Sequence, residues 1–488
     1  MNNHLRTAIP ILALILSIAC LVAGQGSPAA PSAVESPLTP PPPENGPTGA
    51  SPTSAPTAGP TLPARPTRLN ASGPYVLFGG SAGIWITNPD GSFPTQLSTI
   101  DVTTDDLHEL VSPAGDHLAV VGQDEQGLDL YLIDIPDGRT QKIAHLLDLT
   151  SQDLLDATSP RAITSYAISG YSNVAWNPVS GSQLAFTGAV NGPTSDLYLY
   201  DLQNGEVTQL TSGASQAILP SWSPDGKYIL HYGVSWVPPF GGAILGYNRI
   251  DGAWAVRVSD GKILPQPKPK DKVNFVGWQD DRHYLIYDSD ETCYSVHLRN
   301  VDVTTGEATP FMDWSFYYGI AQSPENMALL FSGAAGCPSS PGEGLFLLPP
   351  NQSTPAQLSD KKAYDVSWLP ESGVFQAYPE GLVSSDGSIR YAPPVYDHSF
   401  HPAVSKKGYP AWEVIENTQG RVEVLLPGGS WQTLLKGAVD ELIWDPVQGD
   451  TLLISLDDGS LVAAAFPDFT PRSMGDLGGR VSQAIWIP

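Results

Sequence analysis

The stretch WSPDGKYIL at residues 222–230 decides the fold. Its Pro-Asp-Gly presets a tight turn, because Pro fixes the first central torsion, Asp bonds its own backbone and Gly tolerates torsions that other residues avoid. The apolar run ILPS at residues 218–221 precedes it, and the β-rich YILHY at residues 228–232 follows. The stretch therefore predicts a two-stranded hairpin with Trp222 at the end of its first strand.

The same context recurs along the chain. Six of the 12 Trp residues stand in it, and three degenerate copies fill the gaps. We call these nine positions slots; their first residues are Val111, Trp176, Trp222, Trp278, Gln322, Trp368, Phe400, Trp444 and Trp486. Successive slots are 65, 46, 56, 44, 46, 32, 44 and 42 residues apart. Clustering near 45 is typical of four-stranded propeller blades.

The two ends of this array complement each other. Residues 75–86 read as later strands of a unit that lacks its first strand, whereas residues 481–488 read as a first strand and slot with nothing after them. A blade built from both termini leaves no open edge strand. We therefore expect an all-β fold, a single closed β-propeller over residues 69–488 whose last blade is completed by both termini. Several small sandwiches are the alternative.

The Trp222 unit resembles the repeat of TolB-type, WD-like β-propellers of bacterial envelope proteins. This resemblance implies that the motif residues are structural, with the aromatic packed between blades. The slots predict eight or nine four-stranded blades, and the degenerate unit near residues 366–394 is the one in doubt.

Residues 1–24 predict an export signal. An apolar run over residues 8–23 follows Arg6 and is short for a membrane span. Within it, LSIAC at residues 16–20 resembles the bacterial lipobox, which implies acylation of Cys20. Ordinary cleavage near Ala23 and an uncleaved anchor are the alternatives. Residues 25–68 are rich in Pro, Ser and Thr and predict a disordered tether that holds the propeller off a membrane, outside the cytoplasm.

Composition limits the classes of partner. Hydrophobic residues make up 41% of the chain and charged residues 15%, and the net charge is −26. This charge repels phosphate backbones, so we expect no nucleic-acid partner. We also expect contact with the membrane through the N-terminus only, no cofactor, and a monomer.

Aromatic residues in the long connections are the candidate ligand contacts, because rigid strands leave the loops free to vary. Such rings can stack on sugars or anchor a peptide. Packing between blades is the alternative use of the same rings. The candidates, with one histidine, are Trp236, Phe240, Tyr247, Trp314, Tyr317, Tyr318, Tyr396 and His398.

An insertion at residues 145–172 lengthens the first interval. Its Leu pairs at 146–147 and 154–155 suggest a short amphipathic helix that covers an apolar patch, with a lid on the channel as the alternative. Catalytic signals are weak. The GGSAG at residues 79–83 resembles a nucleophile elbow but joins two predicted strands. Asp397, His398 and His401 have metal-like spacing, but we expect no metal because His401 lies inside a slot.

Cysteine use fits export. Cys293 and Cys337 each lie 15 residues after a slot, in successive blades. Equivalent positions on neighbouring blades predict a disulfide, with two free thiols as the alternative.

We expect the chain to be a non-catalytic, membrane-tethered propeller that binds a protein, peptide or glycan of the envelope through its loops. A propeller hydrolase or lyase acting on a glycan or lactone is the alternative, and a structural spacer is a third reading. An enzyme needs carboxylates or histidines gathered around an axial pocket, whereas a binding protein needs an aromatic loop surface.

Overall fold

The computed structural model describes most of the chain beyond the tether. The described residues are 69, 73–80, 82–102, 107–124, 126–150, 153, 159–169, 172–237, 247–267, 273–289, 295–333, 342–349, 352, 354–369, 372–475 and 481–487. Within them, the backbone alone is described at 237, 247–248, 273–274, 288–289, 295–296 and 313–319. All belong to one compact unit, Pro52–Pro488. No helix in these ranges is long and apolar enough to cross a membrane.

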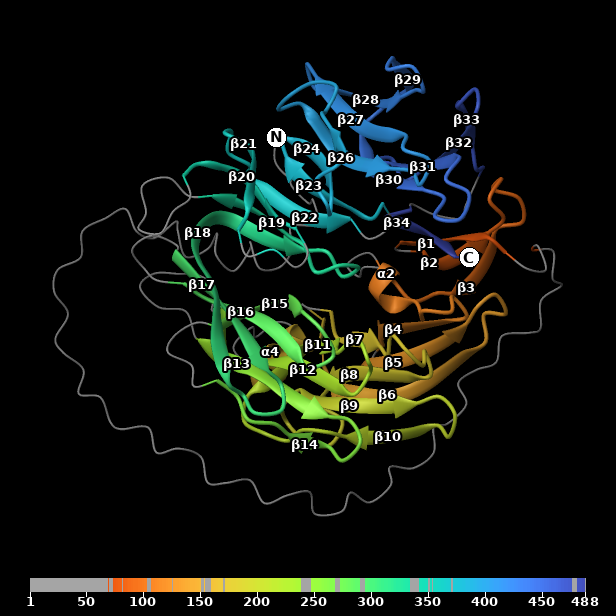
Figure 1. Cartoon of the computed structure of the whole chain (residues 1–488). Coiled ribbons are helices and arrows are strands. Elements are labelled where there is room, and N and C mark those ends of the chain that lie inside the picture. The colour runs from red at the N-terminus through yellow and green to blue at the C-terminus, as the bar shows by residue number, and fades with distance from the viewer. Residues whose placement is uncertain are drawn as a thin grey trace, which may run out of the picture. The chain divides into compact units, whose positions relative to one another are not determined.

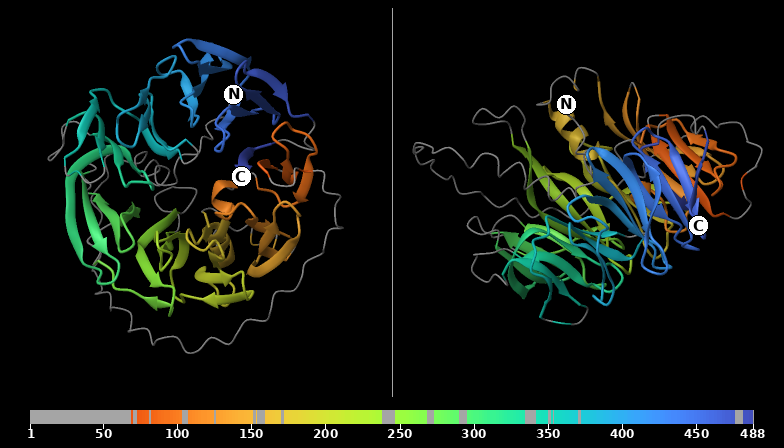
Figure 2. Two further views of the ribbon diagram at one scale, coloured as in Figure 1. Left: turned by 45° about the vertical axis from the view of Figure 1, so that its right-hand side comes forward. Right: turned by 90° about the horizontal axis from the view of Figure 1, so that it is seen from above.

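The described residues form a ring of nine antiparallel blades (Figures 1 and 2), which confirms the upper of the two expected numbers. Blade 1 contains β34 (Gln483–Ile487), β1 (Tyr75–Gly80), β2 (Gly83–Thr87) and β3 (Thr95–Ser98). Blade 2 contains the Val111 bridge, β4 (His117–Gln123), β5 (Gly127–Asp134) and β6 (Thr140–Asp148). Blade 3 contains β7 (Val174–Trp176), β8 (Gln183–Gly188), β9 (Asp196–Asp201) and β10 (Glu206–Gln209).

The next three blades include the longest strands. Blade 4 contains β11 (Gln216–Trp222), β12 (Tyr228–Val237), β13 (Tyr247–Arg257) and β14 (Lys262–Ile263). Blade 5 contains β15 (Val273–Trp278), β16 (His283–Ser289), β17 (Ser295–Asp302) and the first part of β18 (Ala308–Gln322). Blade 6 contains the rest of β18, β19 (Leu329–Gly333), β20 (Gly344–Leu348) and β21 (Ala356–Ser359). Because β18 belongs to both blades, they form one seven-stranded sheet.

Three further blades lead back to blade 1 and complete the ring. Blade 7 contains β22 (Asp365–Leu369), β23 (Val374–Tyr378), β24 (Gly381–Ser384) and β25 (Arg390–Tyr391), so the degenerate unit near residues 366–394 is a genuine blade. Blade 8 contains β26 (Ser399–Val404), β27 (Pro410–Glu416), β28 (Gln419–Leu425) and β29 (Trp431–Lys436). Blade 9 contains β30 (Val439–Trp444), β31 (Thr451–Leu456), β32 (Leu461–Ala465) and β33 (Thr470–Ser473).

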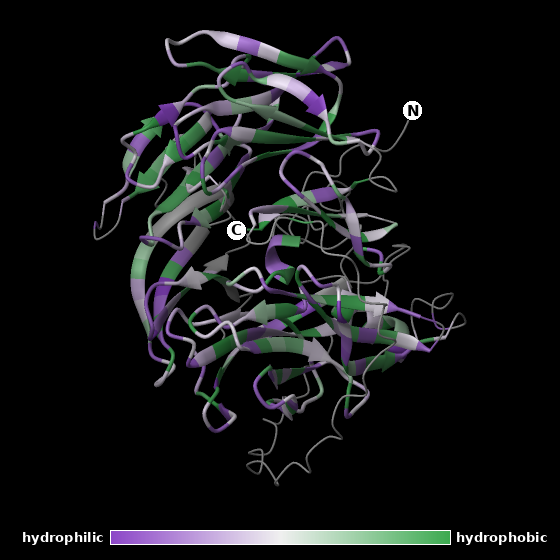
Figure 3. Ribbon diagram, turned by 90° about the vertical axis from the view of Figure 1, so that its right-hand side faces the viewer, coloured by the Kyte–Doolittle hydropathy of each residue, from purple (hydrophilic) through white to green (hydrophobic). Residues whose placement is uncertain are grey.

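The C-terminal strand closes the ring as expected. β34 pairs antiparallel with β1, so that Tyr75 lies opposite Ile487 and Gly79 opposite Gln483. Ile485 and Trp486 are buried, one on each face of the blade. Figure 3 shows hydrophobic residues along the strands and hydrophilic residues in many turns, as packed blades require.

Slot tryptophans join neighbouring blades. In three of them the indole N–H group donates to the carbonyl of the residue directly before the slot of the preceding blade, whereas the indole nitrogens of Trp278 and Trp444 have no hydrogen-bond partner among the described residues. These bonds run from Trp176 to Leu110, from Trp222 to Ala175 and, between blades 1 and 9, from Trp486 to Ile443, at 2.8, 2.8 and 3.5 Å. The aromatic slot residues are therefore structural, as the resemblance implied.

One slot was assigned four residues too early. Ser223 N donates to Tyr228 O at 2.9 Å in the Trp222 turn, and Ser405 N donates to Tyr409 O at 3.1 Å in blade 8. The slot of blade 8 thus begins at Val404, not at Phe400. A bulge between Phe400 and Ala403 accounts for the shift, because it places His401 and Pro402 within the first strand.

The insertion between blades 2 and 3 differs from the prediction. Residues 146–147 belong to β6, residues 154–155 lie outside the described residues, and the helix described here is α4 (Pro160–Ser169). α4 packs on β6 and β11, and Thr164 Oγ1 accepts a hydrogen bond from Gln216 Nε2 at 3.1 Å. Ala167 and Ile168 are fully buried, which confirms the covering role expected of this insertion.

Candidate functional site

Two faces of the ring differ in their connections. Strands alternate in direction, so the connection from the second to the third strand and the connection to the next blade leave at the same end. We call that end the loop face. The opposite end carries the turns between first and second strands and between third and fourth strands, and we call it the turn face.

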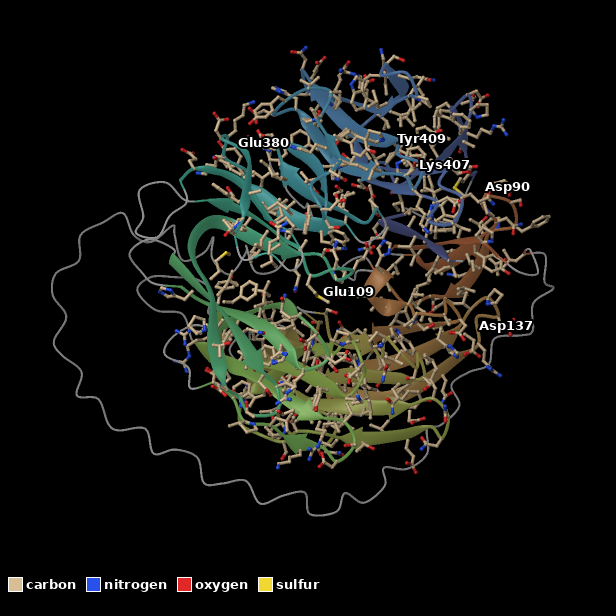
Figure 4. All side chains as sticks on the ribbon, viewed as in Figure 1. Asp90, Glu109, Asp137, Glu380, Lys407 and Tyr409 are labelled. Atoms are coloured by element: carbon tan, nitrogen blue, oxygen red, sulfur yellow. The ribbon has the colours of Figure 1, made fainter. Side chains whose placement is uncertain are left out.

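Three connections of the loop face meet over blade 7. They follow β21, β23 and β25, and they contribute residues 360–364, 379–380 and 392–398. Figure 4 labels Glu380 among them and Asp90, Asp137 and Lys407 in turns of the opposite face. We call the resulting set of side chains the tyrosine patch: Lys361, Tyr364, Tyr378, Glu380, Tyr396 and His398.

Tyr396 links two of these connections to its own. Its phenol oxygen donates to Glu380 Oε1 at 3.0 Å, and Lys361 Nζ lies 4.3 Å from its ring centroid. Partial burial and the bond to Glu380 raise the pKa of Tyr396 to about 12, so the phenol stays neutral and keeps donating. The side chain is nevertheless 40% exposed. The ring is therefore fixed in place and open to solvent.

The other two tyrosines have different roles. Tyr378 stacks on Phe400 with centroids 5.5 Å apart, and its phenol donates to Asp397 O at 3.2 Å. It thus supports the residue 392–398 connection from below. Tyr364 is 53% exposed, and Lys362 Nζ lies 5.4 Å from its ring centroid. Tyr364 and Tyr396 are the two exposed rings of the patch.

His398 lies at the same tip as Tyr396. The side chain is exposed, and its Nδ1 donates to Tyr396 O at 3.1 Å. Asp397 between them has a φ of 61°, a left-handed torsion that an Asp adopts more readily than most residues. The turn therefore presents a ring and an imidazole to solvent side by side.

Exposed apolar side chains on the turn face are of another kind. They are Phe93, Val179, Ile389, Val447 and Phe466, none of which carries a polar group. Phe93 and Phe466 are 46% and 42% exposed, as much as Tyr396. Rings with polar handles, flanked by lysines and carboxylates, gather instead over blade 7, and such rings suit recognition because one end is apolar and the other wet.

The remaining predicted contacts are not brought into this patch. Trp236 and Tyr247 were expected in a loop, but they lie in the paired strands β12 and β13, opposite Asn248 and Val237. Trp314, Tyr317 and Tyr318 likewise fall within β18 rather than in a loop. Phe240 lies outside the described residues. Of the eight predicted residues, Tyr396 and His398 lie in this patch.

The partners of these two residues escaped the sequence reasoning. Lys361 and Glu380 come from connections that the sequence analysis did not single out, more than 15 residues away. The available signal was topological. Both stand in loop-face connections of blade 7, before its first strand and between its second and third strands.

Signs of a catalytic centre are sparse in the described ranges. No group of three or more His, Cys, Asp or Glu side chains there is placed to hold a metal ion. A hollow of about 230 Å³ lies between β17 and β18 of blade 5, lined by His297, Leu298, Arg299, Ala308 and Pro310. It is formed by outer strands of the blade rather than by the first strands nearest the ring centre. Gly80 and Gly83 end and begin the paired strands β1 and β2, unlike a nucleophile elbow.

Two covalent features fall outside the described residues. Cys293 lies between β16 and β17, and Cys337 lies between β19 and β20. Each connection joins the second strand of a blade to its third strand, and the two blades are neighbours. The disulfide between Cys293 and Cys337 stays a prediction, because neither residue is among those described. Lipidation of Cys20 stays a prediction as well.

Comparison with known proteins extends to the fold. No family model matches the sequence. The uncharacterized protein Atu1656 of Agrobacterium fabrum is 27% identical over 197 residues, which make up 39% of this chain and 63% of that protein. The chain thus matches less than two thirds of this relative's length.

The chain was also compared with solved structures. The crystal structure of the eukaryotic initiation factor has a TM-score of 0.52 at 11% identity, over 86% of this chain and 99% of that chain. A TolB-type structure from Agrobacterium tumefaciens has a TM-score of 0.29 at 14% identity, over 75% of this chain and 88% of that one. At 11% identity, the similarity to the initiation-factor structure shows a common fold and not a shared activity.

Proposed function

We propose that this chain is a non-catalytic, extracytoplasmic propeller, tethered through its N-terminus, that binds an envelope protein, peptide or glycan at the tyrosine patch. The observation that carries the proposal is the fixed, exposed ring of Tyr396, bonded to Glu380 and covered in part by Lys361. A ring that is already oriented loses little conformational entropy when a ligand stacks on it.

The patch offers both parts of a recognition surface. Tyr364 and Tyr396 offer flat apolar area, and each stacked ring contributes about 1 kcal/mol beyond area burial. Lys361, Glu380 and His398 offer donors and acceptors at the edges of these rings. Such groups suit the hydroxyls of a sugar or the backbone of an extended peptide, and they fix its orientation.

The test compares two faces of one molecule. Purified propeller is applied to glycan and peptide arrays as the wild type, as the double variant Tyr364→Ala with Tyr396→Ala, and as the control Phe93→Ala. Phe93 is exposed to the same degree on the turn face. We expect the double variant to lose roughly 10- to 100-fold in affinity for whatever the wild type binds, and the control to bind normally.

Two results contradict the proposal. One is equal binding by the double variant and the wild type, which removes the tyrosine patch from consideration. The other is a wild-type chain that binds nothing on either array while it is folded by circular dichroism.

A further inference from the structure

A buried carboxyl group joins blades 8 and 9 near the loop face. Glu413 lies on β27 and is 2% exposed. Its Oε1 accepts a hydrogen bond from the backbone N–H of Val439 at 3.0 Å. Val439 is the first residue of β30, so this bond runs from the second strand of blade 8 to the first strand of blade 9. Glu413 therefore positions the point at which the chain enters blade 9.

The other carboxyl oxygen faces an imidazole. Glu413 Oε2 lies 3.7 Å from His401 Nε2. His401 belongs to the bulge of β26 and has a φ of 46°, a left-handed torsion that is uncommon outside glycine and that re-aims the side chain. Burial lowers the pKa of His401, so the imidazole is neutral near pH 7 and keeps one ring nitrogen as an acceptor.

The charges that act on Glu413 are negative. Asp457, in the loop-face turn of blade 9, and Asp440, on β30, both disfavour its ionised form. On β28, the cation Arg421 is engaged by Glu423 at 2.6 Å and Glu416 at 3.0 Å. Burial first, with these like charges, raises the pKa of Glu413 to about 7, despite the bond from Val439.

We propose that Glu413 and His401 form a proton-binding latch between blades 8 and 9. With a proton on Oε2, the Glu413 O–H donates to the neutral imidazole and Oε1 still accepts from Val439. A separation of 3.7 Å is about 1 Å longer than such a hydrogen bond, so protonation draws the two side chains together. When the proton leaves to solvent, the buried carboxylate on blade 8 faces Asp440 and Asp457 of blade 9, which repel it. The contact between blades 8 and 9 is therefore tightest in acid, and it loosens above neutrality.

The latch adjoins the tyrosine patch along the chain. The connection that carries Tyr396 and His398 continues directly into β26, which contains His401. We therefore expect separation of blades 8 and 9 to displace the tyrosine patch. This consequence rests on the proposed function, whereas the latch itself does not.

The experiment measures the free energy of unfolding from pH 5 to pH 8.5 for the wild type and Glu413→Gln. The native pKa of Glu413 is higher than that of an unfolded chain, near 4.5, so the native state holds this proton more tightly. Its stabilising effect is complete below pH 4.5 and is lost as the pH rises through about 7. Gln reproduces the protonated form, so we expect the unfolding constant of the variant to lie roughly 30- to 300-fold below that of the wild type at pH 8.5, and within about fivefold of it at pH 5.

A matched control separates the latch from a general effect of removing charge. Glu423 is 7% exposed on the neighbouring strand and is paired with Arg421. We expect Glu423→Gln to lose stability but to keep the fall in stability between pH 5 and pH 8.5 that the wild type shows. A parallel profile for Glu413→Gln overturns the proposal, and so does failure of this variant to fold at pH 8.5.

Hydrogen exchange gives a second readout in the unmodified protein. We expect protection of the Val439 amide, corrected for intrinsic rate, to fall between pH 5 and pH 8, because burial and the aspartates of blade 9 disfavour the ionised carboxyl group more strongly than its bond from Val439 favours it. The Asp445 amide, bonded to Thr451 O at 2.9 Å within the same blade, serves as the control. Equal protection of Val439 at both pH values contradicts the latch, and array binding by the tyrosine patch is unaffected by that outcome.

Discussion

Closure of the ring by β34 can be tested by removing that strand. In a chain truncated after residue 480, β1 becomes an open edge. The three large apolar side chains of β34, Ile485, Trp486 and Ile487, are each at most 7% exposed, and burying them contributes about 7 kcal/mol. Pairing of five residues with β1 adds about 5 kcal/mol, and ordering the strand costs about 7 kcal/mol. Closure is thus worth about 5 kcal/mol, comparable to the whole stability of many domains.

The assay combines truncation with complementation. We expect the truncated chain to unfold at a lower urea concentration than the intact chain and to associate through the exposed edge of β1 in size-exclusion chromatography. A synthetic peptide of residues 481–488 should bind to it with a Kd on the order of 0.1–1 mM and restore the monomer. The same peptide with Ile485→Asp is the control, because it would bury a charge in the core next to Leu77.

The reasoning fails if the truncated chain stays monomeric with the urea midpoint of the intact chain. It also fails if the Ile485→Asp peptide restores the monomer as well as the native sequence does. Either result would mean that β34 lies on the ring without holding it closed.

Three further outcomes are expected. Trp222→Phe should lower the free energy of unfolding in urea by about 1 kcal/mol more than Trp444→Phe does. Trp222 Nε1 donates to a neighbouring blade, whereas Trp444 Nε1 has no partner among the described residues. Equal losses in the two variants would refute this expectation. Asp129→Asn should destabilise blade 2 by about 2 kcal/mol, measured in the same way, because the buried carboxylate binds a lysine and a histidine at 2.6 Å, and an unchanged midpoint contradicts it. Cys293 and Cys337 should resist alkylation in the exported protein until a reductant is added; immediate labelling of both refutes the disulfide.

Much of this fold could be read from the sequence because its determinants are local. A Pro-Asp-Gly turn after Trp222 fixes a hairpin without help from distant residues, and the recurrence of the slot about every 45 residues predicts eight or nine blades. Prediction failed where a local pattern was broken. In blade 8 the bulge at His401 and Pro402 imitates a slot, and the true turn at Ser405 carries no Pro-Asp-Gly.

The site was harder to predict because it is assembled from separate connections. Tyr396 could be singled out as an aromatic in a proline-containing loop, but its contacts with Lys361 and Glu380 depend on how two other connections cross the top of blade 7. Elsewhere, long spacings were taken for loops. The 10 residues of β12 and the 15 residues of β18 form extended strands instead, because hairpin pairing satisfies their backbone groups.

The connections between blades differ strongly from one another, and the proposed binding surface lies on one of them. Between blades 5 and 6 the continuous strand β18 takes the place of a loop. Between blades 2 and 3 the connection contains α4, which packs on β6 and β11. Between blades 7 and 8 it instead presents Tyr396 and His398 to solvent. The first strands carry the repeated indole bonds and cannot change without loosening the ring, whereas these connections can. The proposed ligand would therefore bind at the connection after β25. The Glu413–His401 latch lies close to the point where this connection enters β26.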